Sequence, residues 1–393
     1  MEDSIYHLSY RQVLTLCVTG LLCMGALMVE SASMHVTGQV GWQWTHTGQK
    51  HLAYAAAALL MFWLVGQFDY AILTRRALWR NSITHLTAVA ILACALVLIP
   101  HVGLQVNGAR RWLPIGPIQL QPSELAKWSV VLFLAYWLAY RPVDMERFTR
   151  GFLPMLAPVG LICLLIVIQD FGTAALIALC AVAMCIVGRV RWRHLLIVLP
   201  PVIAIGFWFL HHKEYRWRRM TAFLNPYAAP QREGYHMIQS LLSFSSGGLW
   251  GKGLGNGVQK LGYLPEDTTD FIFAVICEEM GLFGALLTIA FFLGIIFVAF
   301  QVIKQKRDSF GRLLAFGVAA MTGFQALMNI AVATVSIPTK GLSLPLVSAG
   351  GSGLVITCAS LGLLRSVARF DHDGADEEKS AWDLQSTDLA AAL

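Results

Sequence analysis

Apolar runs of about 20 residues recur along this chain, and each is long enough to cross the ~30 Å hydrocarbon core of a bilayer. Of the 393 residues, 56% are hydrophobic and only 13% are charged, which is about half the charged share of a soluble globular domain. We therefore predict an all-α polytopic membrane protein folded as one helical bundle. The predicted transmembrane spans, about ten in number, are 12–30, 52–69, 82–100, 123–140, 152–169, 172–188, 193–212, 270–303, 313–335 and 344–364.

The Lys and Arg residues predict how this bundle is oriented. An even number of spans puts both termini on one side, and the segments on that side hold most of the basic residues outside the longest loop. Because cytoplasmic loops carry the excess of positive charge, we predict that both termini are cytoplasmic. The large loop between the seventh and eighth spans, 213–269, is then extracytoplasmic. The short loops on that outer side hold only Lys50, Arg110, Arg111 and Lys340.

The distribution of charge also bears on partners. The net charge of +6 is spread between apolar runs rather than gathered in one patch, so no nucleic-acid partner is predicted. The extracytoplasmic loop 213–269 carries further Lys and Arg residues. Their presence there suggests an anionic ligand on the outer side of the membrane.

Two further features bound the domain organisation. Residues 371–393 are acidic with few large apolar side chains, which predicts a disordered cytoplasmic tail. Residues 1–370 are then a single transmembrane domain. The eight cysteines fall inside apolar runs, without a CxxC pair or a Cys/His cluster, so neither a zinc site nor a disulfide framework is predicted.

Polar residues gather in four clusters on the predicted outer side. The first runs from 107 to 113 and continues in QPSELAK, 121–127, where Pro122 predicts a helix start with Glu124 in its first turn. Lys127 lies one turn deeper. It either snorkels to the interface or faces inward and pairs with Glu124 or an anionic substrate, because an intramembrane charge is costly without a partner.

The second cluster is Asp170, which lies in a tight hairpin between the spans 152–169 and 172–188. One interpretation is that its carboxylate caps the helix that follows. The other is that it pairs with an inward basic group such as Lys127 or Arg111.

The third cluster is the extracytoplasmic loop. Residues 215–223 have apolar and basic side chains at helical spacing, which predicts a helix lying in the membrane interface. Its arginines either anchor it to headgroups or meet a pyrophosphate. Residues 245–257, which include Lys252, are rich in glycine and offer backbone N–H groups to an anion. Their spacing is not that of a P-loop.

The end of this loop carries Glu266 and Asp270. Thr269 or Asp270 can cap the span that follows. Alternatively, the Asp270 carboxylate lies where the bilayer meets water and takes a proton from a sugar hydroxyl, if burial and Glu266 raise its pKa. About two turns deeper, at least one of Glu278 and Glu279 must face the bundle interior.

The fourth cluster is the segment 338–352. Lys340 is an outer cation that can meet a phosphate, and Ser348 follows in the same segment. The Gly350–Gly351 pair allows close helix packing or a break in the backbone.

Taken together, these segments resemble the SEDS family (shape, elongation, division and sporulation proteins). The resemblance rests on four motifs in the expected order: QPSELAK, QDFGT, GLWGKGLGNGVQKLGYLPEDTTDFIFAVICEE and PTKGLSLPLVSAGG. Within the family, NGARRWL and PTKGL are more similar to the division branch, FtsW, than to RodA. Two departures are the missing proline before Asp170, where the family commonly has QPDLG, and Gly353 where the family has a second serine. Neither removes a proposed catalytic group.

The resemblance implies a ten-helix membrane fold that polymerises lipid II into glycan strands on the outer face of the bacterial cytoplasmic membrane, at the division septum. Asp270 matches the family's essential aspartate, the proposed general base. Other matching positions, implied to bind substrate, are Arg110, Glu124, Lys127, Lys252, Glu266 and Lys340. We add Arg111 and Ser348 as candidate substrate-binding residues.

The implied reaction also sets the expected cofactors and partners. The departing undecaprenyl pyrophosphate needs positive charge, which these basic residues or a divalent cation (Mg²⁺ or Mn²⁺) could supply. The sequence itself requires no cofactor. The expected partners are lipid II, a class B penicillin-binding transpeptidase and other divisome membrane proteins. Two alternatives remain: a lipid II flippase, which needs a polar path through the bundle, and a scaffold that only recruits a transpeptidase.

Overall fold

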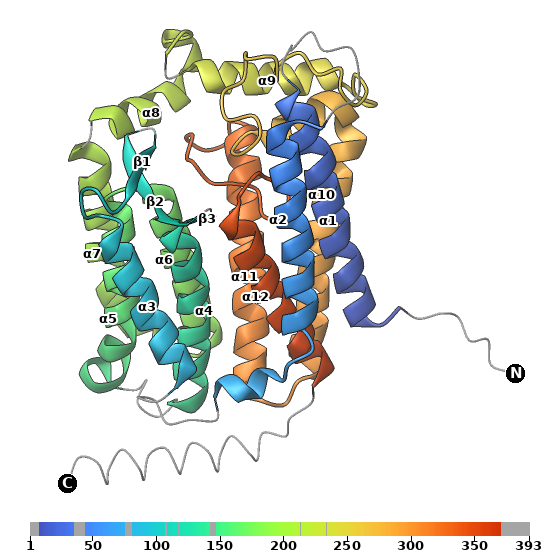
Figure 1. Cartoon of the computed structure of the whole chain (residues 1–393). Coiled ribbons are helices and arrows are strands. Elements are labelled where there is room, and N and C mark those ends of the chain that lie inside the picture. The colour runs from blue at the N-terminus through green and yellow to red at the C-terminus, as the bar shows by residue number, and fades with distance from the viewer. Residues whose placement is uncertain are drawn as a thin grey trace, which may run out of the picture.

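The computed structural model of this protein is a bundle of long helices with a small sheet at one end (Figure 1). The structure describes residues 8–34, 44–74, 81–106, 108–116, 118–141, 147–212, 214–232 and 234–370. The predicted tail, 371–393, lies outside them. The α-helices are α1 (Tyr10–Ser33), α2 (His46–Val65), α3 (Ser82–Leu96), α4 (Pro122–Tyr140), α5 (Leu153–Val167), α6 (Phe171–Val187), α7 (Trp192–His212), α8 (Glu214–Leu224), α9 (Tyr235–Gly247), α10 (Ile272–Gln305), α11 (Ser309–Ala333) and α12 (Ser352–Arg369).

Shorter elements complete the described chain. A 3₁₀ turn, η1, follows α2 at Tyr70–Leu73, a π-helical turn, η4, precedes α5 at Phe148–Phe152, and a 3₁₀ turn, η5, follows α8 at Pro226–Ala228. The strands are β1 (Leu104–Val106), β2 (Ala109–Ile115) and β3 (Ile118–Leu120), paired antiparallel in the order β1-β2-β3. The sequence did not predict this sheet, because its strands are short and interrupted by glycine and proline.

Each predicted span contains a helix. Among the described residues, five helical segments are long and apolar enough to cross a membrane: Tyr10–Ser33, Phe148–Val167, Trp192–His212, Ile272–Gln305 and Ser309–Ala333. Helices α3 and α6 are apolar but shorter. The fold is therefore that of an all-α polytopic membrane protein.

The helices form two groups in Figure 1, with α3 to α7 on one side and α1, α2, α10, α11 and α12 on the other. Helix α4 packs against α11 and joins the groups, while α12 packs against α2 and α1 against α10. Helix α9 lies across the upper end of the bundle and packs against α10 and α11. The sheet and α8 lie toward the same end, so the elements of the predicted outer loops gather there.

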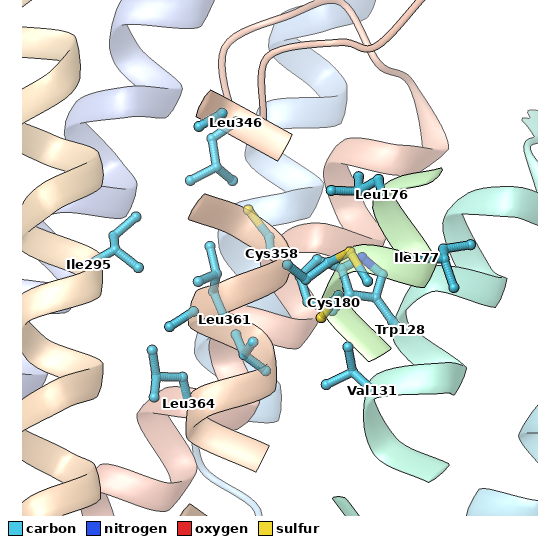
Figure 2. Packing of buried hydrophobic residues seen from close by; sticks show 14 of the residues in the cluster. Trp128, Val131, Leu176, Ile177, Cys180, Ile295, Leu346, Cys358, Leu361 and Leu364 are labelled. Atoms are coloured by element: carbon cyan, nitrogen blue, oxygen red, sulfur yellow. The ribbon is translucent and has the colours of Figure 1, made fainter. Parts of the chain in front are cut away.

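One buried cluster runs through the bundle. Figure 2 shows side chains of α4, α6, α10 and α12 meeting in it: Trp128, Val131, Leu176, Ile177, Cys180, Ile295, Cys358, Leu361 and Leu364. Close backbone approach tightens the α2–α12 contact, since a Cβ added at Gly362 would lie 2.7 Å from the Phe62 carbonyl oxygen. Small residues of this kind let helices pack closely where lipid removes the hydrophobic driving force.

The last helix begins later than predicted. Helix α12 starts at Ser352 rather than at residue 344. Two residues of the preceding segment have left-handed backbone angles, with φ of 65° at Leu346 and 51° at Gly351, which a right-handed helix does not allow. The apolar side chains of this segment are buried in turns, so their hydrophobicity had suggested a span.

Helix α10 is broken near its start. Its backbone leaves the helical conformation at Gly281, where φ is 64° and ψ is −157°. The residues after the break bond to the glycine-rich loop: the Leu282 N–H donates to the Gly248 carbonyl oxygen at 3.0 Å. Only glycine adopts these backbone angles readily.

Gly281→Ala is expected to destabilise the protein by about 1–3 kcal/mol, because the new Cβ requires a strained backbone and would lie 2.4 Å from the Gly251 nitrogen. A fall in the thermal unfolding midpoint in detergent measures this. The matched control is Gly160→Ala on α5, where nothing lies within 4 Å of an added Cβ. Equal midpoints for the two variants would contradict the role assigned to Gly281.

Candidate active site

Asp270 lies in the turn that enters α10. The Phe271 N–H donates to the Glu266 carbonyl oxygen at 3.1 Å, and the Asn329 side-chain amide donates to the Asp270 carbonyl oxygen at 2.8 Å. The N-cap of α10 is Phe271, which makes no side-chain capping bond. The prediction that Thr269 or Asp270 caps this helix is therefore wrong, and the partly buried Asp270 carboxylate is left for another role.

A cation from a distant segment lies beside this carboxylate. A Cβ added at Gly341 would be 3.3 Å from Asp270 Oδ2 and 3.4 Å from Arg111 Nη1. The acid and the guanidinium therefore both approach Gly341 on the side where a Cβ would stand, immediately after Lys340. Arg111 belongs to β2, so the unpredicted sheet is what brings this cation to the site.

Asp170 fulfils both interpretations offered by the sequence. Its carboxylate caps α6, accepting hydrogen bonds from the Thr173 N–H at 3.1 Å and the Thr173 hydroxyl at 2.9 Å. It also lies 3.9 Å from Arg111 Nη1. The same guanidinium donates from Nη2 to the Gln169 carbonyl oxygen at 3.0 Å. The predicted tight hairpin between α5 and α6 thus holds Arg111 in place.

Lys340 is the second cation of this site, after Arg111. Its ammonium nitrogen lies 5.3 Å from the centre of the Phe171 ring, at cation–π distance. Its Cβ lies 3.3 Å from the position that a Cβ at Gly172 would take. Arg111, Asp170, Asp270 and Lys340 are called the Asp270 cluster below.

The surroundings shift the proton affinity of two members of the cluster. Burial raises the pKa of Asp270 to about 7, helped by the negative charges of Glu266 and Asp170 and opposed by Arg111 and Arg219. Burial lowers the pKa of Lys340, and Asp170 opposes this shift. An acid whose pKa lies near neutrality beside cations is suited to accept a proton next to an anionic leaving group.

Three other predicted residues bond to the turn that carries Asp270 or to the hairpin that holds Arg111. The Glu266 carboxylate accepts from the Thr269 hydroxyl at 2.9 Å and raises the pKa of Asp270. The buried Ser348 hydroxyl donates to the Thr269 carbonyl oxygen at 2.5 Å. The Arg110 backbone N–H donates to Gln169 Oε1 at 3.2 Å. Ser348 therefore holds the turn that carries Asp270.

Glu124 and Lys127 form a separate buried pair. Lys127 Nζ lies 2.8 Å from Glu124 Oε1 and donates to Gln325 Oε1 at 2.6 Å, and the lysine is fully buried. Lys127 therefore faces inward and is paired, which was one of its two interpretations. Its ammonium contacts α4 and α11 rather than the Asp270 carboxylate.

Lys252 lies in the glycine-rich loop and pairs with Glu278 at 2.7 Å. The backbone N–H groups of this loop bind the protein's own acids: those of Gly255 and Gly257 donate to Glu279 at 3.1 and 3.3 Å. Both glutamates are buried, as the sequence required of at least one of them. In this structure the glycine-rich loop thus binds the carboxylates of Glu278 and Glu279 on α10.

Several residues that shape the site were not singled out from the sequence. Asn329 and Gln325 are amides inside an apolar span, and that mismatch was a usable signal. Arg219 was grouped with interfacial arginines, yet it acts on the pKa of Asp270. Within the described ranges, no group of three or more His, Cys, Asp or Glu side chains is arranged to hold a metal ion.

The similarity to known proteins agrees with this arrangement. A family model described as a cell cycle protein, FtsW/RodA/SpoVE, matches residues 11–373. The chain belongs to the FtsW/RodA/SpoVE family. A relative named "Probable peptidoglycan glycosyltransferase FtsW" from Coxiella burnetii is 36% identical over 372 residues, covering 93% of this chain and 98% of the relative. One of the same name from Aliivibrio salmonicida is 37% identical, covering 92% and 89%.

Solved structures of FtsW/RodA/SpoVE-like proteins match the fold as well. A chain of a peptidoglycan synthase complex, described for its coordination of polymerisation and crosslinking, superposes with a TM-score of 0.72 at 28% identity, covering 91% of this chain and 96% of that one. The rod shape determining protein RodA of Thermus thermophilus gives 0.64 at 27% identity, covering 91% and 95%. The family and the apolar helices together make this an integral membrane protein.

Proposed function

We propose that this protein is a peptidoglycan glycosyltransferase that polymerises lipid II into glycan strands and releases undecaprenyl pyrophosphate, in septal cell-wall synthesis during cell division. The observation that carries the proposal is Asp270, a partly buried acid with its pKa raised to about 7, beside Arg111. The names of the FtsW relatives support the same reaction.

In the proposed reaction, Asp270 is the general base. The 4-hydroxyl oxygen of one lipid-linked disaccharide bonds to the anomeric carbon at the end of another chain, and the bond from that carbon to the pyrophosphate breaks. The hydroxyl proton passes to Asp270, and the bonding electrons leave with the pyrophosphate. A positioned base of matched pKa contributes about 10²–10⁴-fold to such a rate.

Arg111 and Lys340 receive the departing pyrophosphate. Fixed cations near developing negative charge stabilise a transition state because they need no reorganisation. A divalent cation, Mg²⁺ or Mn²⁺, could add charge near the pyrophosphate. Asp170 would then supply the carboxylate oxygens that such ions prefer, and Asp270 would stay free to accept the proton. The lipid tails of the two substrates lie against apolar surfaces of the bundle, such as the open face of α7 that carries Leu199, Ile203 and Phe207.

The proposal includes a topology. The chain crosses the bacterial cytoplasmic membrane ten times, with both termini in the cytoplasm and the Asp270 cluster on the outer side, at the division septum. The gathering of α8, α9 and the sheet at one end of the bundle supports this (Figure 1). The likeness to a chain of a peptidoglycan synthase complex supports a class B penicillin-binding transpeptidase as the partner, together with other divisome proteins.

Incubating the purified protein and its transpeptidase partner with fluorescent lipid II in liposomes tests the function. Glycan strands resolved on a gel are the expected product. A flippase would instead move lipid II between leaflets without lengthening it, and that result would contradict the proposal. The buried charges that could line a flipping path are Lys127, Glu278 and Glu279. Each is paired within the protein, with Glu124, Lys252 and Lys260 respectively, which favours catalysis.

The raised pKa of Asp270 predicts a pH dependence. Since a general base works only when ionised, kcat for polymerisation is expected to rise with pH to a half-maximum near pH 7, where the Asp270 pKa lies, and then to level off. The pH–rate profile in a buffer series measures this. A half-maximum near pH 4, the ordinary range of an aspartate, would contradict the raised pKa of Asp270.

A further inference from the structure

Two buried amides on α11 reach the segment that carries Asp270. Asn329 is fully buried, and its side-chain nitrogen donates to the Asp270 carbonyl oxygen at 2.8 Å and to the Leu342 carbonyl oxygen at 2.7 Å. Both partners are acceptors, so the amide nitrogen must face them. One planar group therefore ties together the turn before α10 and the segment that follows Lys340.

Gln325 makes the equivalent contact one turn earlier on α11. Its side-chain nitrogen donates to the Ser343 carbonyl oxygen at 2.9 Å, and its Oε1 accepts from Lys127 at 2.6 Å. Residues four apart on a helix project from the same face. Gln325 and Asn329 thus hold consecutive carbonyl groups of the 342–343 segment from one face of α11.

The buried Glu124–Lys127 pair on α4 stabilises the contact between Gln325 and Ser343. Lys127 is fully buried and is held between Glu124 and Gln325. An ion pair withdrawn from water is costly unless its remaining hydrogen bonds are satisfied. Gln325 satisfies one of them, so the orientation of its amide is fixed by the lysine on one side and by Ser343 on the other.

We infer that Asn329 and Gln325 are positioning residues that set the separation of Asp270 from the Lys340 segment, and that Glu124 and Lys127 act through Gln325 rather than on substrate. The inference rests on the proposed function of Asp270. Gly341 immediately precedes Leu342 and Ser343 in the chain, and a Cβ added at Gly341 would lie 3.3 Å from Asp270 Oδ2. A shift of the 342–343 segment would therefore move the Gly341 backbone relative to the Asp270 carboxylate.

An unsatisfied polar atom of Asn329 supports a positioning role for this residue. The Asn329 side-chain oxygen is buried without a hydrogen-bond partner among the described residues. An unsatisfied buried oxygen destabilises the folded state, so the amide is not the choice that stability alone would favour. It does, however, supply two N–H donors from one short side chain, as the two carbonyl oxygens require.

Asn329→Leu and Asn329→Gln in the lipid II polymerisation assay test the inference. Leucine fills the volume without donors, and we expect kcat per folded molecule to fall about 100-fold with KM within about threefold, the pattern of a misplaced catalytic group. Glutamine keeps both donors but moves them by one methylene, and we expect a fall of about tenfold. If the leucine variant does not fold, the kcat of the glutamine variant alone tests the inference.

Thr322→Val is the matched control. Thr322 is also buried on α11, and among the described residues its hydroxyl bonds only to the Val318 carbonyl oxygen within the helix. The kcat of this variant should equal that of the wild type. Wild-type kcat per folded molecule in Asn329→Gln would overturn the inference, as would a loss that merely follows the loss of folded protein. Full activity in Asp270→Ala would instead overturn the proposed function.

Discussion

Replacing Asp270 by asparagine or alanine is expected to lower the rate of lipid II polymerisation by about 10²–10⁴-fold, the contribution of a positioned general base. Asparagine has nearly the shape of aspartate but cannot accept the proton. The segment around it should keep its structure, because Asn329 bonds to the backbone carbonyl of residue 270 and not to its carboxylate. The initial rate of strand formation per folded molecule measures the effect.

The stability of the Asp270→Asn variant is an independent check. A carboxyl whose pKa is raised on folding, here from 3.8 to about 7, binds its proton more tightly in the folded state. Folding stability therefore falls as the pH rises through this window, and the neutral amide avoids that loss. The variant should be inactive yet at least as stable as the wild type at neutral pH. Glu214→Gln, an exposed acid on α8, should leave both properties unchanged.

Replacing Arg111 by glutamine is expected to lower kcat by about 10²–10³-fold, the usual effect of removing one group that stabilises developing negative charge. The same change should move the pH–rate profile. Because the Arg111 guanidinium holds the pKa of Asp270 down against the effect of burial, its loss raises that pKa, and the half-maximum should shift to higher pH. A fall in kcat with an unmoved profile would contradict the pairing of these two groups.

Arg218→Gln is the control for Arg111. Arg218 lies on α8, is about half exposed and pairs with Glu214 at 2.5 Å; an exposed pair of this kind contributes little. Its kcat and profile should match those of the wild type. Arg111→Lys should recover only part of the rate, since a lysine cannot bond to Gln169 and approach Asp170 with a planar fork.

Much of the fold followed from the sequence because hydropathy is a strong local signal. Each predicted span contains a helix, and α4 begins at Pro122 as expected. The start of α12 was missed because the turn segment 344–351 is as apolar as a helix, and only the left-handed angles at Leu346 and Gly351 exclude it. The sheet was missed because the short strands around Arg111 carry no alternating pattern.

The sequence predicted which residues belong to the site, but not which of them pair with one another. Asp270 and Lys340 followed from the motifs that carry them, and the Asp270 carboxylate lies near Gly341, the residue after Lys340. Lys252 and Lys127 have the same charge as Lys340, yet each pairs with a buried glutamate. Which lysine meets which acid depends on helix packing across the bundle, and no local pattern encodes it.

The central claim is that Asp270 changes protonation near neutral pH. Infrared difference spectroscopy of the protein in nanodiscs, comparing the wild type with Asp270→Asn across a pH series, observes this carboxyl group directly. We expect a protonated-carboxyl band in the wild type that is absent from the variant and that disappears with a midpoint near pH 7. An Asp270 carboxylate that stays ionised down to about pH 4, as an unperturbed aspartate does, would contradict it.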